Sequence, residues 1–488
     1  MDKLGALDAN FLYSETDNVK NHVATVQVMQ LPEGAEPQAF IASLKLFIGN
    51  RVHLVPYLHR KVREVPGRLD HPVWVHDTHF DINNHVFEVA VDAPGGQDEI
   101  DACVAQLHAV RMDVTKPLWN LYVLTGLPDN QVAYYYQTHH AAIDGVSGQL
   151  AIQRLFDESY DHPDISPPEG FALEENASLS GLMADTWANL LRFQVDAASR
   201  YLGSLESSHR MLQRMVNPGL GLGALAQPAP RTRFNDNVAP ERSWVSTSLP
   251  IADLKQVAKP MGCTLNDAFL AVCGGALRRY LSRRGELPAE SLVAACPVSL
   301  HEPGDRSFGN KVTMMLVELA TDETAPLTRL LRVHQSAETA KGVTADMAAG
   351  YDPDVSLPGL PAVMTSMARL GELSGIASQL TPVSNVVISN VPGPRKPLFS
   401  NGAEMLTHYP VSLVTHGQGL NITVQSYCDE MFVGITACAD ALPDAKLLRD
   451  DLLAAFAELR ACLEPAQIAD FRIVNEPGPE APVASQVA

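Results

Sequence analysis

Several features are scarce in this 488-residue sequence, and each absence excludes a class of protein. No uninterrupted apolar run is long enough to cross a membrane, and the first residues lack the charged-then-apolar profile of a signal peptide. The sequence has only 36 lysines and arginines but 56 aspartates and glutamates, so the net charge is −20. Such a chain lacks the basic face of a nucleic-acid-binding protein. We therefore expect a cytoplasmic protein, soluble or peripherally attached to a membrane, that binds no nucleic acid.

Cysteine and basic residues give little sign of a metal or cofactor site. The seven cysteines are an odd number and no two have CxxC spacing, so we expect reduced residues of the core. Two basic clusters could line a pocket for an anionic cofactor, although solvated helix ends explain each of them more simply. These clusters are Arg60, Lys61 and Arg63, and Arg278, Arg279, Arg283 and Arg284.

Hydrophobic periodicity predicts two α/β regions joined by a helical linker. The expected divisions are an N-terminal lobe over 1–160, a linker over 161–230, a C-terminal lobe over 231–462 and a disordered tail over 463–488. Strands are expected at 22–31, 118–127, 130–139, 292–298, 311–318, 383–389, 420–427 and 431–437. Helices are expected at 37–51, 99–113, 264–281 and 444–462, with a long helical segment over 179–216.

The stretch HHAAIDG, His139–Gly145, lies where a predicted strand ends and a predicted helix begins. Neighbouring side chains on a strand point to opposite faces, so the two histidines are a poor pair for one metal ion. Ser147 lacks the GxSxG elbow of a serine hydrolase. The pattern alone leaves two interpretations open, a structural turn and a general base. We expect Asp144 to hold the turn, through an arginine salt bridge or backbone amides.

The same stretch resembles the HHxxxDG signature of the CoA-dependent acyltransferase superfamily. Other segments narrow the resemblance to the bacterial wax ester synthase/diacylglycerol acyltransferase family, over roughly residues 1–462. These segments are LDANFL (Leu7–Leu12), PLW (Pro117–Trp119), APRTRFN (Ala229–Asn235), ND (Asn266–Asp267), SNVPGPRKPLFSNGAEM (Ser389–Met405) and GLNITVQSY (Gly419–Tyr427).

The resemblance implies a fold and a set of site residues. The fold has two chloramphenicol-acetyltransferase-like lobes, with mixed sheets flanked by helices and an active-site tunnel between the lobes. His140 matches the catalytic base, and His139 matches its supporting neighbour. Asp144 matches the structural aspartate, and Gly145 matches the turn glycine. Asn266 and Asp267 match a pair that shapes the active site or the acyl-CoA channel, and Asn390 is a further candidate. A helix N-terminus also favours polar residues such as Asn266 and Asp267. No metal ligand is implied.

The implied activity is transfer of a long-chain acyl group from acyl-CoA, the co-substrate, to a hydrophobic alcohol, without a bound cofactor. The acceptor would be diacylglycerol, a long-chain alcohol, or both, giving triacylglycerol or wax ester. Alternatives are the same chemistry on a polyketide or glycolipid hydroxyl, and a docking module for acyl-carrier proteins, which would not need an intact motif. Oily substrates also imply peripheral contact with the inner face of the plasma membrane or with lipid inclusions. The apolar stripe of 179–216 is a candidate for this contact, although a helix covering the core explains it more simply.

Overall fold

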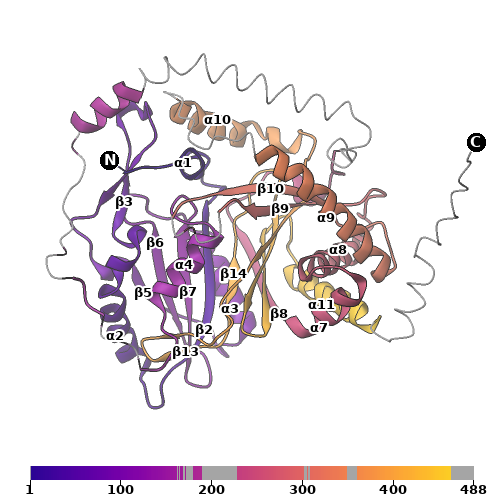
Figure 1. The fold of residues 1–488 in the computed structure, drawn as a ribbon, viewed down its shortest axis with the longest axis horizontal. Coiled ribbons are helices and arrows are strands. Elements are labelled where there is room, and N and C mark those ends of the chain that lie inside the picture. Colours follow the sequence, from indigo (N-terminus) through magenta and orange to yellow (C-terminus); the bar gives the residue numbers. More distant parts are fainter. Residues whose placement is uncertain are drawn as a thin grey trace, which may run out of the picture.

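The structure is a computed structural model. It describes residues 2–462 except 162, 164, 169–170, 172–177, 179, 190–227, 302–304, 306–307 and 349–359. Two lobes lie side by side, each built on one large sheet (Figure 1). Each sheet has its own hydrophobic core, because its buried strands and the helices over them form a separate cluster of apolar side chains. This arrangement confirms the predicted mixed α/β class.

The N-terminal lobe has a sheet in the order β12-β13-β2-β7-β6-β5, and β14 also pairs with β2. Strands β2 and β7 run antiparallel along their whole length, which brings His22 opposite His139. A small sheet of order β1-β4-β3 lies in the same lobe. The elements contributed by the N-terminal half are β1 (Asp2–Lys3), α1 (Ala6–Tyr13), β2 (His22–Gln30), α2 (Pro37–Gly49), β3 (Arg60–Arg63), β4 (Val73–His76), β5 (Val86–Ala90), α3 (Gln97–His108), β6 (Trp119–Thr125), β7 (Gln131–His139) and α4 (Gly145–Leu155).

The C-terminal lobe has a sheet in the order β10-β9-β11-β15-β16-β8. Only β11 is parallel to its neighbours, so this sheet is mixed. Helices α8, α9 and α11 lie together beside it (Figure 1). Its elements are β8 (Arg242–Pro250), α7 (Ile251–Ala258), α8 (Leu265–Arg284), β9 (Val293–Ser299), β10 (Val312–Glu318), α9 (Pro326–Ala348), α10 (Leu360–Ser374), β11 (Val386–Val391), β15 (Leu420–Tyr427), β16 (Glu430–Cys438) and α11 (Ala445–Ala461).

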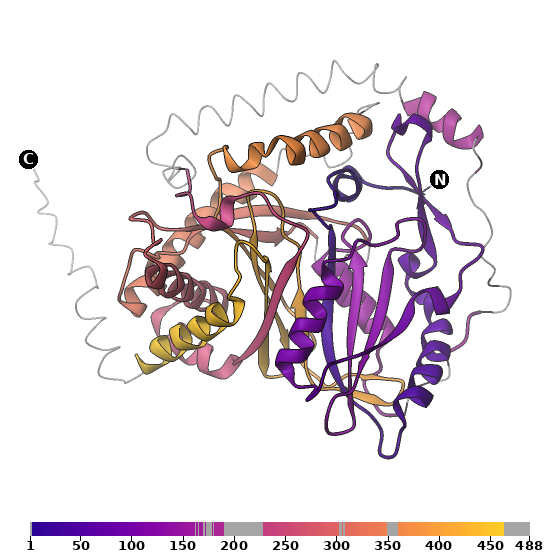
Figure 2. The ribbon, with the colours of Figure 1, turned by 180° about the vertical axis from the view of Figure 1, so that it is seen from behind.

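One segment of the C-terminal half belongs to the N-terminal sheet. Strands β12 (Phe399–Ser400), β13 (Ala403–Met405) and β14 (Tyr409–Val411) cross between the lobes, and β13 and β14 both pair with β2. Figure 2 shows this orange segment beside the purple strands of the other lobe. The predicted lobe boundaries did not include this exchange, and the division into lobes and linker otherwise stays a prediction.

Most predicted elements are present, with differences at their ends. The helix expected over 99–113 ends at His108, and the strand expected over 383–389 is β11, Val386–Val391. Elements β8, α7, α9 and α10 were not predicted. The long helical segment is helical at 180–189, and most of its remainder lies outside the described residues. No helix among the described residues is long and apolar enough to cross a membrane.

Candidate functional site

The HHAAIDG stretch forms the predicted turn between a strand and a helix. Strand β7 ends at His139, and α4 begins at Gly145 with Asp144 as its N-cap residue. The backbone N–H of His140 donates to the carbonyl of Asn21, at 2.8 Å. This bond continues the pairing of β7 with β2 one residue beyond the strand, so the backbone of His140 is held by the sheet.

The side chain of His140 is half-buried and packed on one face by an aromatic ring. Phe11 of α1 stacks against the imidazole with ring centroids 4.2 Å apart. The Nδ1 atom is buried, so a substrate cannot reach it. Nε2 is therefore the ring nitrogen through which His140 can meet a substrate.

Burial lowers the pKa of His140 below its ordinary value of 6.5. The residue's own backbone carbonyl and the charge of Asp144 act in the opposite direction but do not offset this desolvation. A lowered pKa keeps the imidazole neutral at pH 7, and a neutral imidazole can accept a proton. The ring is thus suited to act as a general base near neutral pH.

Asp144 holds the turn with both of its oxygens. Oδ1 accepts hydrogen bonds from the backbone N–H of Ser147, at 2.8 Å, and from its hydroxyl, at 2.7 Å. Oδ2 lies 2.8 Å from Nε2 of His301 and accepts from the backbone N–H of Lys311, at 3.2 Å. The expected backbone amides are present, and the side-chain partner from the other lobe is a histidine, whereas the sequence had suggested an arginine. Asp144 therefore ties the motif to the C-terminal lobe.

His139 is fully buried beside a second carboxylate. Its Nδ1 accepts from the backbone N–H of Ala141, at 3.1 Å, and its Nε2 lies 3.6 Å from Oε1 of Glu15. Burial would raise the pKa of Glu15, but contacts with His139 and Arg111 lower it overall. The Nε2–H that remains on His139 consequently faces an ionised carboxylate. His139 and His140 have separate partners, which suits a supporting role for His139.

Asn310 and Asp8, like His301, are site residues that sequence reasoning missed. Asn310 donates through Nδ2 to the carbonyl oxygen of His140, at 2.6 Å, and to Oδ1 of Asp8, at 2.7 Å. Its backbone N–H also donates to the same Asp8 oxygen. Burial raises the pKa of Asp8, although the bonds from Asn310 act to lower it. Asp8 lies in the LDANFL segment, which marked it as part of the family pattern without indicating a role.

Asn266 and Asn390 come together, whereas Asp267 points elsewhere. Nδ2 of Asn390 donates to Oδ1 of Asn266, at 3.0 Å, at the start of α8. The residue after Asn390, Val391, packs against Gly145, which places this pair near the motif. Asp267 forms a capping box with Thr264 at the start of α8 and also bonds His334. Their role in the acyl-CoA channel stays a prediction.

The basic clusters are largely engaged in ion pairs. In the second cluster, Arg279 and Arg283 pair with Asp451, and Arg284 pairs with Asp444. In the first cluster, Arg60 pairs with Asp2, and Lys61 pairs with Asp77. These contacts give the arginines of α8 a structural role in attaching α11.

Two cavities are lined largely by residues of the N-terminal lobe. One is almost wholly apolar, has an empty volume of about 550 Å³, and extends between β7 and the helices α2 and α4. Tyr134 and Tyr136 line it from β7, where a spacing of two residues puts them on the same face of the strand. The second, of about 880 Å³, is lined by Ala141 and Ala142 among others. The second pocket therefore reaches the HHAAIDG turn itself, whereas the walls of the apolar cavity come from β7 before the turn and from α4 after it.

Two lobes with mixed sheets, joined at an HHxxxDG turn that carries a half-exposed histidine, define the class of CoA-dependent acyltransferases. The chain belongs to the wax ester synthase/diacylglycerol acyltransferase family. The model of that family's catalytic domain matches residues 4–269, and the model of its C-terminal domain matches residues 308–460. The family inferred from the sequence motifs is therefore confirmed.

Individual relatives are similar in sequence to this protein over nearly its whole length. The O-acyltransferase WSD of Acinetobacter baylyi is 31% identical over 452 residues, covering 91% of this chain and 93% of the relative. A candidate diacylglycerol O-acyltransferase of Mycobacterium tuberculosis is 32% identical over 458 residues, covering 93% and 99%. The structure of a wax ester synthase/diacylglycerol acyltransferase from Marinobacter aquaeolei VT8 is similar with a TM-score of 0.66 at 28% identity, covering 94% and 99%. The first condensation domain of the calcium-dependent antibiotic synthetase, with a TM-score of 0.57 at 15% identity, shares the fold.

Proposed function

We propose that this acyltransferase uses His140 as the general base that activates a hydrophobic alcohol for attack on a long-chain acyl-CoA. The observation that carries the proposal is the position of the imidazole. It is partly exposed at the end of β7, burial lowers its pKa, the pocket beside it is lined by Ala141 and Ala142, and Asp144 of the same turn bonds the C-terminal lobe. A base of this kind typically contributes about 10²–10⁴-fold to the rate.

The reaction needs no covalent enzyme intermediate. Nε2 of His140 takes the proton of the acceptor hydroxyl as its oxygen attacks the thioester carbonyl. The C–S bond then breaks, and the thiolate of CoA receives the proton from His140. Ser147 is not available as a nucleophile, because its hydroxyl donates to Asp144.

The apolar cavity of the same lobe supports a long hydrocarbon chain as part of the substrate. Its walls come from Phe47, Ile152 and Leu155 among others, and its polar groups are few. Burying a hydrocarbon chain there releases roughly 0.8 kcal/mol per CH₂ group. The preferred substrates are therefore long-chain acyl groups and oily acceptors such as diacylglycerol or long-chain alcohols, with acyl-CoA as the donor.

We further propose that the enzyme meets these substrates at a membrane or lipid-inclusion surface through α10. The large apolar side chains Val363, Met367, Leu370 and Leu373 all lie exposed along this helix, and Leu373 is 85% exposed. Their spacing of three and four residues puts them on one helical stripe. Exposed apolar stripes of this kind are typical of helices that lie in a lipid interface. Trp187, in the segment singled out earlier, is also exposed and offers a second contact.

The decisive experiment assays purified protein with a long-chain acyl-CoA and either diacylglycerol or a long-chain alcohol, measuring CoA release and the ester product together. The wild-type protein should release CoA and form ester in equal amounts. His140→Ala should reduce the rate by at least about 10²-fold while the protein stays folded. A matched His79→Ala variant, which changes an exposed histidine, should retain full activity. If His140→Ala kept most of the activity, the proposed base would be wrong.

A further inference from the structure

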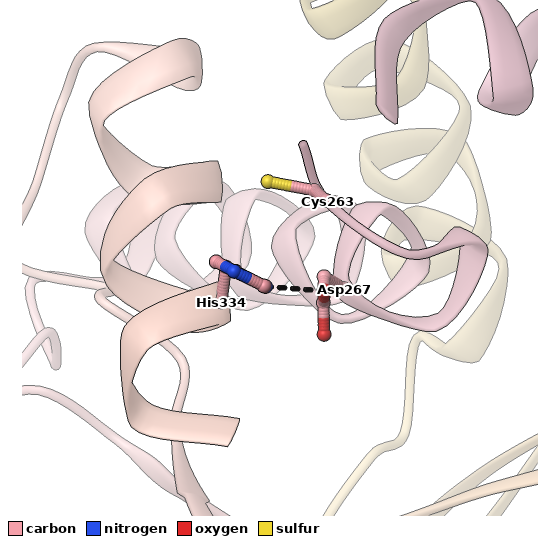
Figure 3. A group of neighbouring side chains, drawn as sticks. All are labelled: Cys263, Asp267 and His334. Carbon is pink, nitrogen blue, oxygen red and sulfur yellow. Dashed lines mark hydrogen bonds and ion pairs between the residues drawn. The ribbon is translucent and has the colours of Figure 1, made fainter. Parts of the chain in front are cut away.

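A second cluster of reactive side chains lies in the C-terminal lobe, apart from the HHxxxDG turn. Cys263 precedes α8, Asp267 lies in the first turn of α8, and His334 comes from α9 (Figure 3). One ligand atom from each side chain lies within 4.8 Å of the other two. The cluster therefore joins two helices at a single point.

The carboxylate of Asp267 has an oxygen that the protein leaves unused. Oδ2 accepts from the backbone N–H of Thr264 and lies 2.8 Å from Nδ1 of His334. Oδ1 has no hydrogen-bond partner among the described residues. Asp267 is only 1% exposed, so solvent does not satisfy this oxygen either. Buried polar atoms normally have partners, so this oxygen indicates a missing ligand.

We propose that Cys263, Asp267 and His334 bind a zinc ion. A thiolate, a carboxylate and an imidazole form a donor set that suits Zn²⁺, whereas Mg²⁺ and Ca²⁺ favour oxygen ligands alone. The two anionic ligands also neutralise its double charge. This site departs from the expectation, based on sequence alone, that the chain has no metal ligands.

The geometry is compatible with tetrahedral coordination. Bonds of about 2.0–2.3 Å to nitrogen, oxygen and sulfur place neighbouring ligand atoms roughly 3.5 Å apart. The three ligand atoms lie within 4.8 Å of one another, so this spacing requires them to move closer by about 1 Å at most. Oδ1 of Asp267 binds the ion while Oδ2 keeps its capping bond from Thr264. His334 is partly exposed, so a water molecule can take the fourth position.

Binding requires a defined change in protons and hydrogen bonds. The thiol of Cys263 gives its proton to solvent as the Zn–S bond forms. His334 binds through Nδ1 as the neutral ring with its hydrogen on Nε2, and this replaces its hydrogen bond to Asp267. The ion would thereby hold the N-terminal end of α8 against α9. Zinc binding at this site does not depend on the acyl-transfer reaction.

The test measures zinc binding to the full-length protein after removal of metal with a chelator. Titration against a chromophoric competitor should give one Zn²⁺ per chain, and Co²⁺ should produce a thiolate charge-transfer band. Cys263→Ser and His334→Gln should each weaken Zn²⁺ binding at least as much as the ~10–100-fold typical of losing a group that only supports a ligand. Both changes spare the capping box, so the helix should stay intact.

Cys462→Ser serves as the matched control, because it removes another partly accessible thiol of the same lobe. It should bind Zn²⁺ like the wild-type protein and keep the cobalt band, whereas Cys263→Ser should lose the band. The proposal is overturned if the wild-type protein binds no Zn²⁺, or if Cys263→Ser and His334→Gln bind it as tightly as the wild type does.

Discussion

Nε2 of His301 lies 2.8 Å from Oδ2 of Asp144, and this contact joins the two lobes at the start of α4. The other ring nitrogen of His301 lies 3.1 Å from Asp305. Asp144 is the N-cap residue of the helix that follows the HHxxxDG turn, so any movement of the C-terminal lobe acts on the turn directly. Both partners are almost fully buried, and solvent screens such a contact less than it screens a surface ion pair.

Loss of this contact should impair both stability and turnover. His301→Ala leaves Oδ2 of Asp144 with only the Lys311 amide, and we expect about 1–3 kcal/mol less free energy of unfolding in urea. Because the turn then holds His140 less firmly, kcat should fall about tenfold or more. His301→Gln, whose amide can still donate, should recover part of both losses. An unchanged kcat in a folded His301→Ala variant would show that His301 does not position His140.

The pH profile should report the lowered pKa of His140. Because burial lowers that pKa below 6.5, the imidazole stays neutral over the range where a free histidine becomes protonated. The acid limb of kcat/KM should therefore lie below pH 6.5, with activity falling only as the pH is lowered through the folded-state pKa. The unfolded chain binds this proton more readily, so the stability that the neutral form contributes is also lost as pH falls below 6.5. Circular dichroism separates inactivation from unfolding, and an acid limb at or above 6.5 contradicts the expectation.

Chain-length preference should depend on the apolar cavity behind β7. Ala151 of α4 lines this cavity, so Ala151→Phe would place a ring inside it. We expect the variant to lose activity with long-chain acyl-CoA or long-chain alcohol while retaining activity with short-chain substrates. Competition between substrates of different length measures this shift. Ala289→Phe, at an exposed loop position, is the control and should leave the preference unchanged. If activity fell equally with substrates of every chain length, the hydrocarbon chain of the substrate would have to bind outside this cavity.

The sequence predicted local features of the site better than contacts between lobes. The strand end at His139 and the turn held by Asp144 follow from patterns within a few residues. Asn310 and His301 could not be predicted, because they reach the motif from more than 150 residues away and sit in segments without a distinctive pattern. Likewise, β12–β14 are too short to show strand periodicity, so their exchange into the other sheet left no sequence signal.

The apolar stripe of α10 should govern binding to lipid but not the chemistry. Replacing Leu370 and Leu373 with aspartate removes two exposed side chains, and full burial of each would contribute roughly 1.5–3 kcal/mol. The double variant should therefore float with phospholipid vesicles at least about tenfold less than the wild-type protein.

The activity of this variant distinguishes membrane contact from a defect at His140. Its rate with diacylglycerol in vesicles should fall, whereas its rate with a short, water-soluble alcohol should match the wild type. A second double variant, Leu46→Asp with Val110→Asp, changes two equally exposed apolar residues of the N-terminal lobe and should bind vesicles normally. If both double variants floated like the wild type, another surface would have to meet the lipid. If both rates fell together, α10 would have to support the fold of the site, since no side chain of this stripe is among those that contact His140.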